Sequence, residues 1–153
     1  MPISQKIRDL IANAWTDGAP CLLATAGPDG PNISPKGSML VFDDEHLAYW
    51  ERSKRQALAN LGADRRVAVI YANFKAQREG VLESGFLRFY GTAELHESGP
   101  LRAAIFARLN KREQEHDGNL SRRNRCARHD ECAFHPARDT HEEQKTARPN
   151  RAL

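Results

Sequence analysis

The sequence predicts a mainly β (α+β) fold, an antiparallel sheet or small barrel with helices at its side. First, short apolar and β-branched runs alternate with stretches rich in Gly, Pro, Asp and Asn, a pattern typical of antiparallel strands joined by tight turns. Second, helical periodicity is confined to three separate segments. Third, the chain contains no GxGxxG, Walker A or GxSxG motif, which disfavours the nucleotide-binding and hydrolase folds built on parallel sheets.

The N-terminal elements follow from local patterns. A first helix is expected because one helical face carries Ile3, Ile7, Leu10, Ile11 and Ala14. Ser4 can serve as its N-cap. Strands are expected over residues 20–26, 33–42 and 47–50, joined by turns at 27–32 and 43–46.

The remaining elements alternate between helix and strand. "SKRQALANLGA" (53–63) predicts a short helix with Ser53 as its N-cap and Gly62 as its end. Strands are expected at 66–74 and 85–95, with an irregular connection at 75–84 between them. Pro100 suits the first turn of a last helix over 100–116.

Composition divides the chain into two regions. Of 153 residues, the last 35 (119–153) carry the entire net charge of +3 and contain no Val, Ile, Met, Trp or Tyr. Such a segment buries too little apolar surface to offset its ordering entropy. We therefore expect a folded domain over 1–118 and a polar, basic tail over 119–153, either disordered or translated out of frame.

The cysteine content and the N-terminus predict a cytoplasmic protein. Three cysteines, an odd number, argue against a disulfide framework and fit a reducing, cytoplasmic environment. The segment "MPISQKIRDLIANAW" is too charged for a signal peptide, and no apolar run is long enough to span a membrane.

The stretch "ISPKGSMLVF" (33–42) is unusual for a strand. Pro35 removes a main-chain donor and Gly37 adds no side chain, so both would be costly in a central strand. A flat ligand could use the free N–H groups of residues 36–39, with Gly37 permitting close approach and Lys36 supplying positive charge. The alternative is an ordinary edge strand.

A second candidate site lies in "YWERSKRQA" (49–57). Ser53, Lys54, Arg55 and Gln56 open the predicted helix, and a helix N-terminus with two cations and a hydroxyl suits a phosphate group. A solvated basic turn is the alternative reading.

Together these segments carry a resemblance to a known family. The hairpin "ATAGPDGPNISPKG", the step "YWERSKRQALANL", the strand "RVAV" and the strand "LRFYGTAEL" resemble the pyridoxamine 5′-phosphate oxidase-like FMN-binding split-barrel family. The likeness runs from about residue 12 to residue 117. It implies an antiparallel split β-barrel with flanking helices, and FMN bound at a homodimer interface.

The resemblance also assigns ligand contacts. It implies that the isoalloxazine ring and ribityl chain of FMN are lined by Ser34, Lys36, Gly37, Ser38 and Met39. It implies that the ribityl phosphate is surrounded by Trp50, Glu51, Ser53, Lys54, Arg55 and Gln56, with Arg55 as the main phosphate ligand because its guanidinium matches phosphate oxygens. The flavin supplies the redox chemistry, and no catalytic side chain is identified.

The chain departs from this family after residue 118, where a last apolar strand normally closes the barrel. We expect that strand to be missing or replaced, and the substrate-binding segment of the true oxidases has no match here. The expected function is therefore a flavin-dependent oxidoreductase acting on a small organic substrate. The alternatives are a non-enzymatic flavin or haem binder on the same barrel, or a deazaflavin (F420)-dependent reductase.

The remaining candidates are weaker. Cys126, His129, Cys132 and His135 are potential zinc ligands, but they lie closer together than the paired ligands of common zinc sites and have no surrounding fold signal. A zinc or nucleic-acid module based on this tail is a third alternative; the sequence favours no metal site. Cys21 is interpreted as a small core residue, His46 as a solvated turn residue, and His96 as having no supported substrate role.

Overall fold

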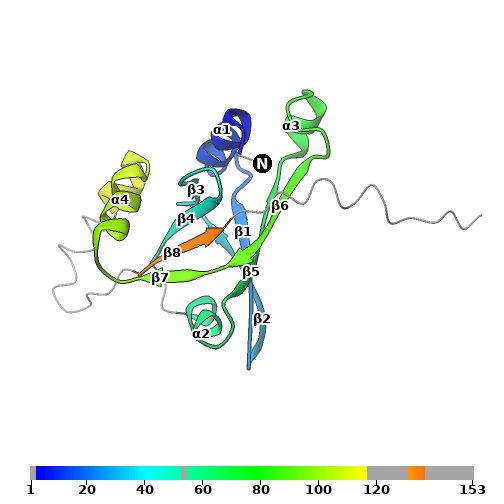
Figure 1. Ribbon diagram of the computed structural model, residues 1–153. Helices are drawn as coiled ribbons and strands as arrows, with labels where there is room; N and C mark the ends of the chain where they lie inside the picture. Colours follow the sequence, from blue (N-terminus) through cyan, green and yellow to red (C-terminus); the bar gives the residue numbers. More distant parts are fainter. Residues whose placement is uncertain (1–2, 53–54, 117–130, 137–153) are drawn as a thin grey trace, which may run out of the picture.

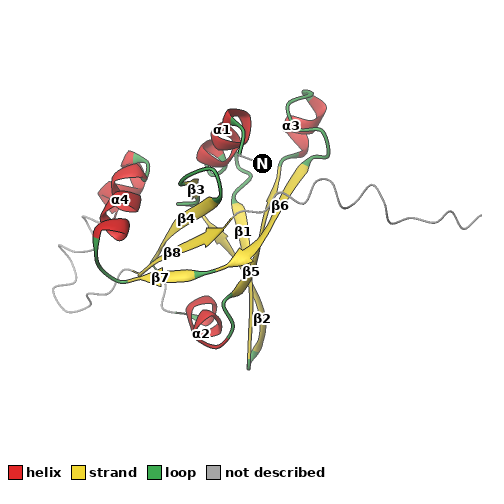
Figure 2. Cartoon of the chain, viewed as in Figure 1, coloured by secondary structure: helices red, strands yellow, loops and turns green. Residues whose placement is uncertain are grey.

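Two four-stranded antiparallel sheets form the structure, a computed structural model that describes residues 3–52, 55–116 and 131–136 (Figures 1 and 2). The first sheet has the order β2 (Gly30–Lys36), β1 (Cys21–Gly27), β5 (Arg66–Ala72) and β6 (Phe86–Thr92). The second has the order β3 (Leu40–Val41), β4 (His46–Glu51), β8 (Glu131–Pro136) and β7 (Glu94–His96).

The chain crosses between the sheets at two points. Residues 37–39 lead from β2 to β3, and Ala93 separates β6 from β7. The predicted strands 33–42 and 85–95 are therefore each divided between the two sheets, because the chain has to turn where one sheet ends. All strand pairs are antiparallel, so the predicted antiparallel barrel split into two sheets is confirmed.

The expected absence of the last strand is corrected. Residues 131–136 form β8, which pairs with β4 on one side and β7 on the other, with Ala48 opposite Phe134 and Leu95 opposite Ala133. Two flanking strands supply main-chain partners on both sides, so a short segment of low apolar content can still occupy this position. The domain boundary at 118 stays a prediction, because residues 117–130 and 137–153 lie outside the described part.

The helices flanking the sheets in the described part of the chain are α1 (Gln5–Asn13), α2 (Gln56–Ala63), α3 (Phe74–Arg78) and α4 (Pro100–Arg108), followed by a short helical segment at 111–116. The N-cap of α1 is Ser4, as predicted, and its side chain accepts a hydrogen bond from the Ile7 N–H at 3.4 Å. In Figure 1, α2 lies beside the lower part of β1 and β2, and α4 lies against the second sheet.

Three helix predictions need correction. The N-cap of α2 is Arg55, and Gly62 lies inside this helix, which ends at Asp64. The expected irregular connection 75–84 contains α3, because the Asn73 side chain accepts from the Ala76 N–H at 2.9 Å and caps it. The last helix breaks at Leu109, whose backbone is extended, before residues 111–116 turn helical again.

The core lies between the two sheets. Alternate residues of β1 and β5 point inward, among them Leu23, Val69 and Tyr71, which are almost completely buried. A second cluster joins β4 to α4 through Ala48, Trp50, Ile105 and Leu109. The burial of these side chains fixes the ends of β2 and β4 beside the start of α2.

Candidate functional site

A pocket of about 450 Å³ lies where β2, β4 and α2 meet. Its volume is within the roughly 300–1,000 Å³ typical of small-molecule sites. Most of the predicted cofactor residues line it: Ser34, Lys36, Gly37 and Ser38 from the first segment, and Trp50, Glu51, Arg55 and Gln56 from the second. The structure therefore brings together two segments that sequence patterns identified separately.

Of the other predicted residues, Met39 lies away from this lining and two lie outside the described residues. Met39 is 5% exposed and packs in the core between the sheets. Ser53 and Lys54 lie outside the described residues. Trp50 does border the pocket, but it is 3% exposed and stacks on Phe106 with ring centroids 5.1 Å apart, so its main contacts are in the core.

The end of β2 explains the unusual proline and glycine. Among the described strands, β2 lies at the edge of its sheet and pairs with β1 alone, and an edge position tolerates Pro35. A Cβ atom at Gly37 would lie 2.8 Å from Cε3 of Trp15, so the absence of a side chain there lets the indole pack closely. The glycine therefore serves the packing of Trp15, a reason that differs from the close ligand approach expected from the sequence.

The turn after β2 presents main-chain donors. The N–H groups of Gly37, Ser38 and Met39 have no acceptor among the described residues. The Ser38 hydroxyl is occupied: it accepts from the Trp50 N–H at 2.9 Å and donates to the Trp50 carbonyl at 3.1 Å. These two hydrogen bonds between the Ser38 side chain and the Trp50 backbone attach the turn to β4 and hold the N–H groups in place.

The charge of Lys36 is paired inside the protein. Its Nζ lies 2.5 Å from Oε2 of Glu51 and 4.9 Å from the centroid of the Tyr49 ring. Both charged side chains are more than nine-tenths buried. A buried charge is tolerated only with a close partner, so Lys36 and Glu51 act as a unit within the wall of the pocket.

Arg55 supplies the exposed cation of this site. It precedes the first turn of α2 and makes no side-chain capping hydrogen bond. The N–H groups of Gln56 and Ala57 have no acceptor among the described residues, as expected for the first turn of a helix. A guanidinium next to a helix N-terminus creates positive potential at this end of the pocket.

A buried amide fixes α2 against the hairpin. Asn60 is completely buried, and its Nδ2 donates to the Gly30 carbonyl at 3.1 Å and to Thr25 Oγ1 at 3.3 Å. Its Oδ1 accepts from Gln56 Nε2 at 2.8 Å. Because Gln56 lines the pocket, this chain of hydrogen bonds connects the β1–β2 hairpin to the site.

Sequence reasoning missed other residues of the pocket, namely Asn32, Arg52 and Ala57. Arg52 forms an ion pair with Glu113 and donates from Nη2 to the Glu113 carbonyl at 3.2 Å. Its position directly before "SKRQ" was a signal that it lies at this pocket. Its contact with Glu113 could not be read from the sequence, because that partner lies 61 residues later in the chain. Ser34 Oγ is buried in this region and has no hydrogen-bond partner among the described residues.

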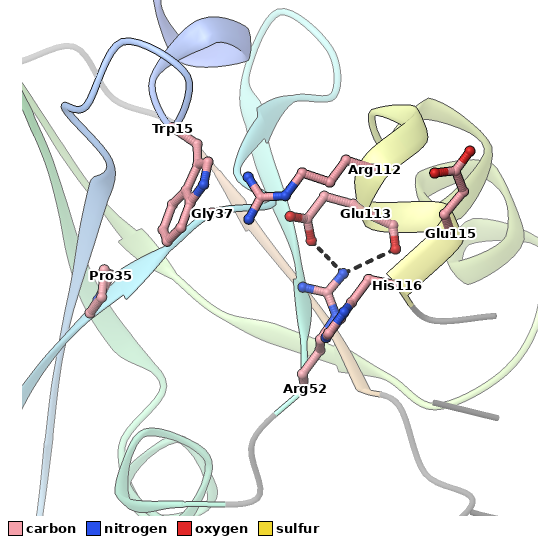
Figure 3. A pocket seen from close by; sticks show the side chains of 8 residues that line it. All are labelled: Trp15, Pro35, Gly37, Arg52, Arg112, Glu113, Glu115 and His116. Atoms are coloured by element: carbon pink, nitrogen blue, oxygen red, sulfur yellow. Dashed lines mark hydrogen bonds and ion pairs between the residues drawn. The ribbon is translucent and has the colours of Figure 1, made fainter. Parts of the chain in front are cut away.

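A second pocket of about 400 Å³ adjoins the first, and the two share Pro35, Gly37 and Arg52. Figure 3 shows Trp15 and Pro35 on one side of it and Arg52, Glu113 and His116 on the other. Arg112 reaches from the helical segment toward Trp15, with its guanidinium carbon 5.2 Å from the centroid of the indole.

The remaining candidates lie away from both pockets. Burial raises the pKa of the Cys21 thiol to about 12, so this residue is not a nucleophile at neutral pH, in line with its interpretation as a core residue. His46, expected as a solvated turn residue, is the half-buried first residue of β4 and lies 2.7 Å from the carboxylate of Asp43. His96 lies 3.5 Å from the carboxylate of Glu94.

Within the described ranges, no three His, Cys, Asp or Glu side chains gather to hold a metal ion. Cys126 and His129 lie outside those ranges. None of the described helices is long and apolar enough to cross a membrane.

Comparison with solved structures identifies the fold. A HupZ variant from Group A Streptococcus superposes with a TM-score of 0.61 at 25% identity, covering 89% of this chain and 95% of its own. An FMN-binding protein from Syntrophomonas wolfei gives 0.55 at 13% identity, covering 88% and 82%. HutZ, the heme storage protein from Vibrio cholerae, gives 0.54 at 17% identity, covering 90% of each chain. At the lower identities the likeness concerns the fold alone.

The sequence comparison reaches further than the expected domain. No curated protein matches this chain. The family model for pyridoxamine 5′-phosphate oxidase matches residues 3–137, which include both pocket-forming segments and β8. The chain therefore belongs to the pyridoxamine 5′-phosphate oxidase family.

Proposed function

We propose that this protein binds FMN in the pocket between β2, β4 and α2 and acts as a flavin-dependent oxidoreductase on a small organic substrate. One observation carries the proposal: the pocket joins the free main-chain N–H groups of Gly37 and Ser38 to a helix N-terminus bearing Arg55. The first suits a flat heterocycle with acceptor atoms along its edge. The second suits a phosphate. FMN has both at opposite ends.

The side chains present fit this group. Arg55 and the N–H groups of Gln56 and Ala57 offer donors to phosphate oxygens. Ser34 Oγ, buried without a partner among the described residues, gains one if a polar ligand group lies against it. Since Lys36 is neutralised by Glu51, positive charge in the described lining is concentrated at the phosphate end.

The roles of the residues follow from this arrangement. When bound, the flavin itself supplies the capacity to accept and donate electrons or hydride. The N–H groups of Gly37 and Ser38 would orient the ring, and the Ser38 hydroxyl would keep those groups fixed through Trp50. The N-terminus of α2 would anchor the phosphate, and Asn60 would hold α2 in position.

We also propose that the protein is a homodimer, with the partner covering the outer face of the first sheet. One row across this face contains Ile33, Ala24, Ala68 and Tyr90, which lie opposite one another in the strand register. Ile33 is 68% exposed and Tyr90 is 45% exposed. Pro35 lies two residues from Ile33 on the same strand and lines the pocket, so this apolar face is continuous with the proposed FMN site.

The first experiment measures flavin binding. Titration of the cofactor-free protein with FMN, followed by quenching of flavin fluorescence, should give saturable binding and a yellow protein. The Arg55→Gln variant should bind FMN about tenfold or more weakly, since a charge-assisted hydrogen bond is lost, while its affinity for riboflavin, which lacks the phosphate, should not change. Arg65→Gln removes a nearby exposed cation outside the pocket and should behave as wild type.

Other outcomes separate the alternatives. Absence of FMN binding, or equal FMN affinity in the wild-type and Arg55→Gln proteins, would contradict the proposed site. An intense absorption band of bound haem in place of the flavin bands would favour a haem binder, the property that HutZ has on this fold. Oxidation of a reduced nicotinamide cofactor by the FMN-loaded protein would support the oxidoreductase over a flavin carrier.

A further inference from the structure

We propose that the second pocket, bounded by Trp15, Pro35, Arg52, Arg112 and His116, binds a small aromatic carboxylate. The pocket measures about 400 Å³, enough for a single substituted ring. Its occupant is defined by charge and by an aromatic wall.

The charges of the pocket balance pair by pair, except at Arg112. The guanidinium of Arg52 is paired with the carboxylate of Glu113. The carboxylate of Glu115 lies 4.0 Å from Nζ of Lys111, one helical turn earlier. No carboxylate of the described residues lies within ion-pair distance of Arg112, whose contact is the Trp15 indole. Arg112 is therefore the cation of this lining with which an anionic ligand can pair.

The guanidinium of Arg52 is engaged with Glu113, to whose carbonyl its Nη2 donates. Arg52 Nε and Glu113 Oε2 are both buried without a hydrogen-bond partner among the described residues, so these two unmet groups belong to one ion pair. The donor open to a ligand carboxylate is therefore the exposed guanidinium of Arg112, whose fork matches two carboxylate oxygens.

The opposite wall selects for a ring. Trp15 is 41% exposed although its indole packs on Gly37, and Pro35 extends the same apolar wall (Figure 3). A flat ring against indole and proline, with its carboxylate toward Arg112, satisfies both sides of the pocket. This proposal does not depend on flavin binding, but the shared residues Pro35, Gly37 and Arg52 would place such a ligand beside the first pocket.

The test uses benzoate, with its neutral analogue benzamide, and follows the indole N–H signals of Trp15 and Trp50 by NMR. Saturable shifts of the Trp15 signal with benzoate, and none with benzamide, are expected. The Trp50 signal should not move, because that side chain lies in the core. The Trp15→Phe variant assigns the two signals.

Variants locate the anion. Arg112→Gln should weaken benzoate binding about tenfold or more, whereas Lys75→Gln, which removes an exposed cation of α3 outside the pocket, should not change it. Arg55→Gln should leave benzoate binding unchanged, so this proposal and the flavin proposal can fail separately. Benzamide binding as tight as benzoate, or equal effects of Arg112→Gln and Lys75→Gln, would overturn the assignment.

Discussion

Lys36 forms a buried ion pair with Glu51 within the protein. Its role is therefore that of a paired charge in the pocket wall. The sequence identified Lys36 as a cation beside a ligand. It could not reveal the partner, because Glu51 is 15 residues away and the contact depends on how two sheets meet. Gly37 shows the same limit: the glycine was recognised as unusual, but its packing against Trp15 depends on the position of the distant turn after α1.

The buried pair gives a stability prediction. Glu51→Gln should lower the free energy of unfolding by about 3–5 kcal/mol, because it leaves the ammonium of Lys36 buried without its counter-charge. The double variant Lys36→Met/Glu51→Leu, which removes both charges, should recover most of this loss. Urea unfolding followed by circular dichroism measures both. A loss below about 1 kcal/mol for Glu51→Gln would be typical of a solvent-exposed ion pair and would contradict the buried one.

Helix α2 and strand β8 show what element-level patterns can and cannot predict. The existence of α2 followed from its apolar stripe, but its first residue did not, because Arg55 at the N-cap makes no side-chain bond that a pattern could reveal. β8 was missed since its residues carry little apolar signal. It is held in the sheet by main-chain pairing with β4 and β7, and this pairing cannot be predicted from the sequence of one segment.

The attachment of α2 to the hairpin can be tested with two glycines. A Cβ at Gly27 would lie 2.4 Å from Asn60 Oδ1, so Gly27→Ala should displace this buried amide. Overpacking of this kind costs about 1–3 kcal/mol, and the displaced helix should also bind FMN more weakly. Thermal unfolding and FMN titration measure the two effects.

The control for this variant lies in the same helix. A Cβ at Gly62 would meet no atom within 4 Å, so Gly62→Ala should leave FMN binding unchanged and raise stability by about 0.5–1 kcal/mol through helix propensity. If Gly27→Ala were as stable as Gly62→Ala, the Asn60 contact would not be what holds α2.

At the scale of the whole molecule, the strand pattern and the turns predict an antiparallel sheet or small barrel, and the family resemblance implies its division into two sheets. The structure and the comparisons agree with both. What single-chain patterns did not show is the apolar outer face of the first sheet. Ile33, Ala24, Ala68 and Tyr90 are spread over four strands, so they form one surface only when the register Ile33–Ala24 and Ala68–Tyr90 is known. A row of this kind is characteristic of a surface that meets another protein.

The proposed dimer can be tested on this face. Ile33→Glu places a charge on a residue that is already 68% exposed in the single chain, so it should fold normally yet convert the dimer to monomer. Phe74→Glu introduces the same charge at a residue that is 57% exposed but lies on α3, outside the row, and should leave the dimer intact. Sedimentation velocity of the wild-type and variant proteins measures the mass of each.

A monomeric wild type, or dissociation by Phe74→Glu with Ile33→Glu still dimeric, would rule out this face. If the face is correct, Ile33→Glu should also weaken FMN binding, because Pro35 connects the interface to the proposed flavin pocket.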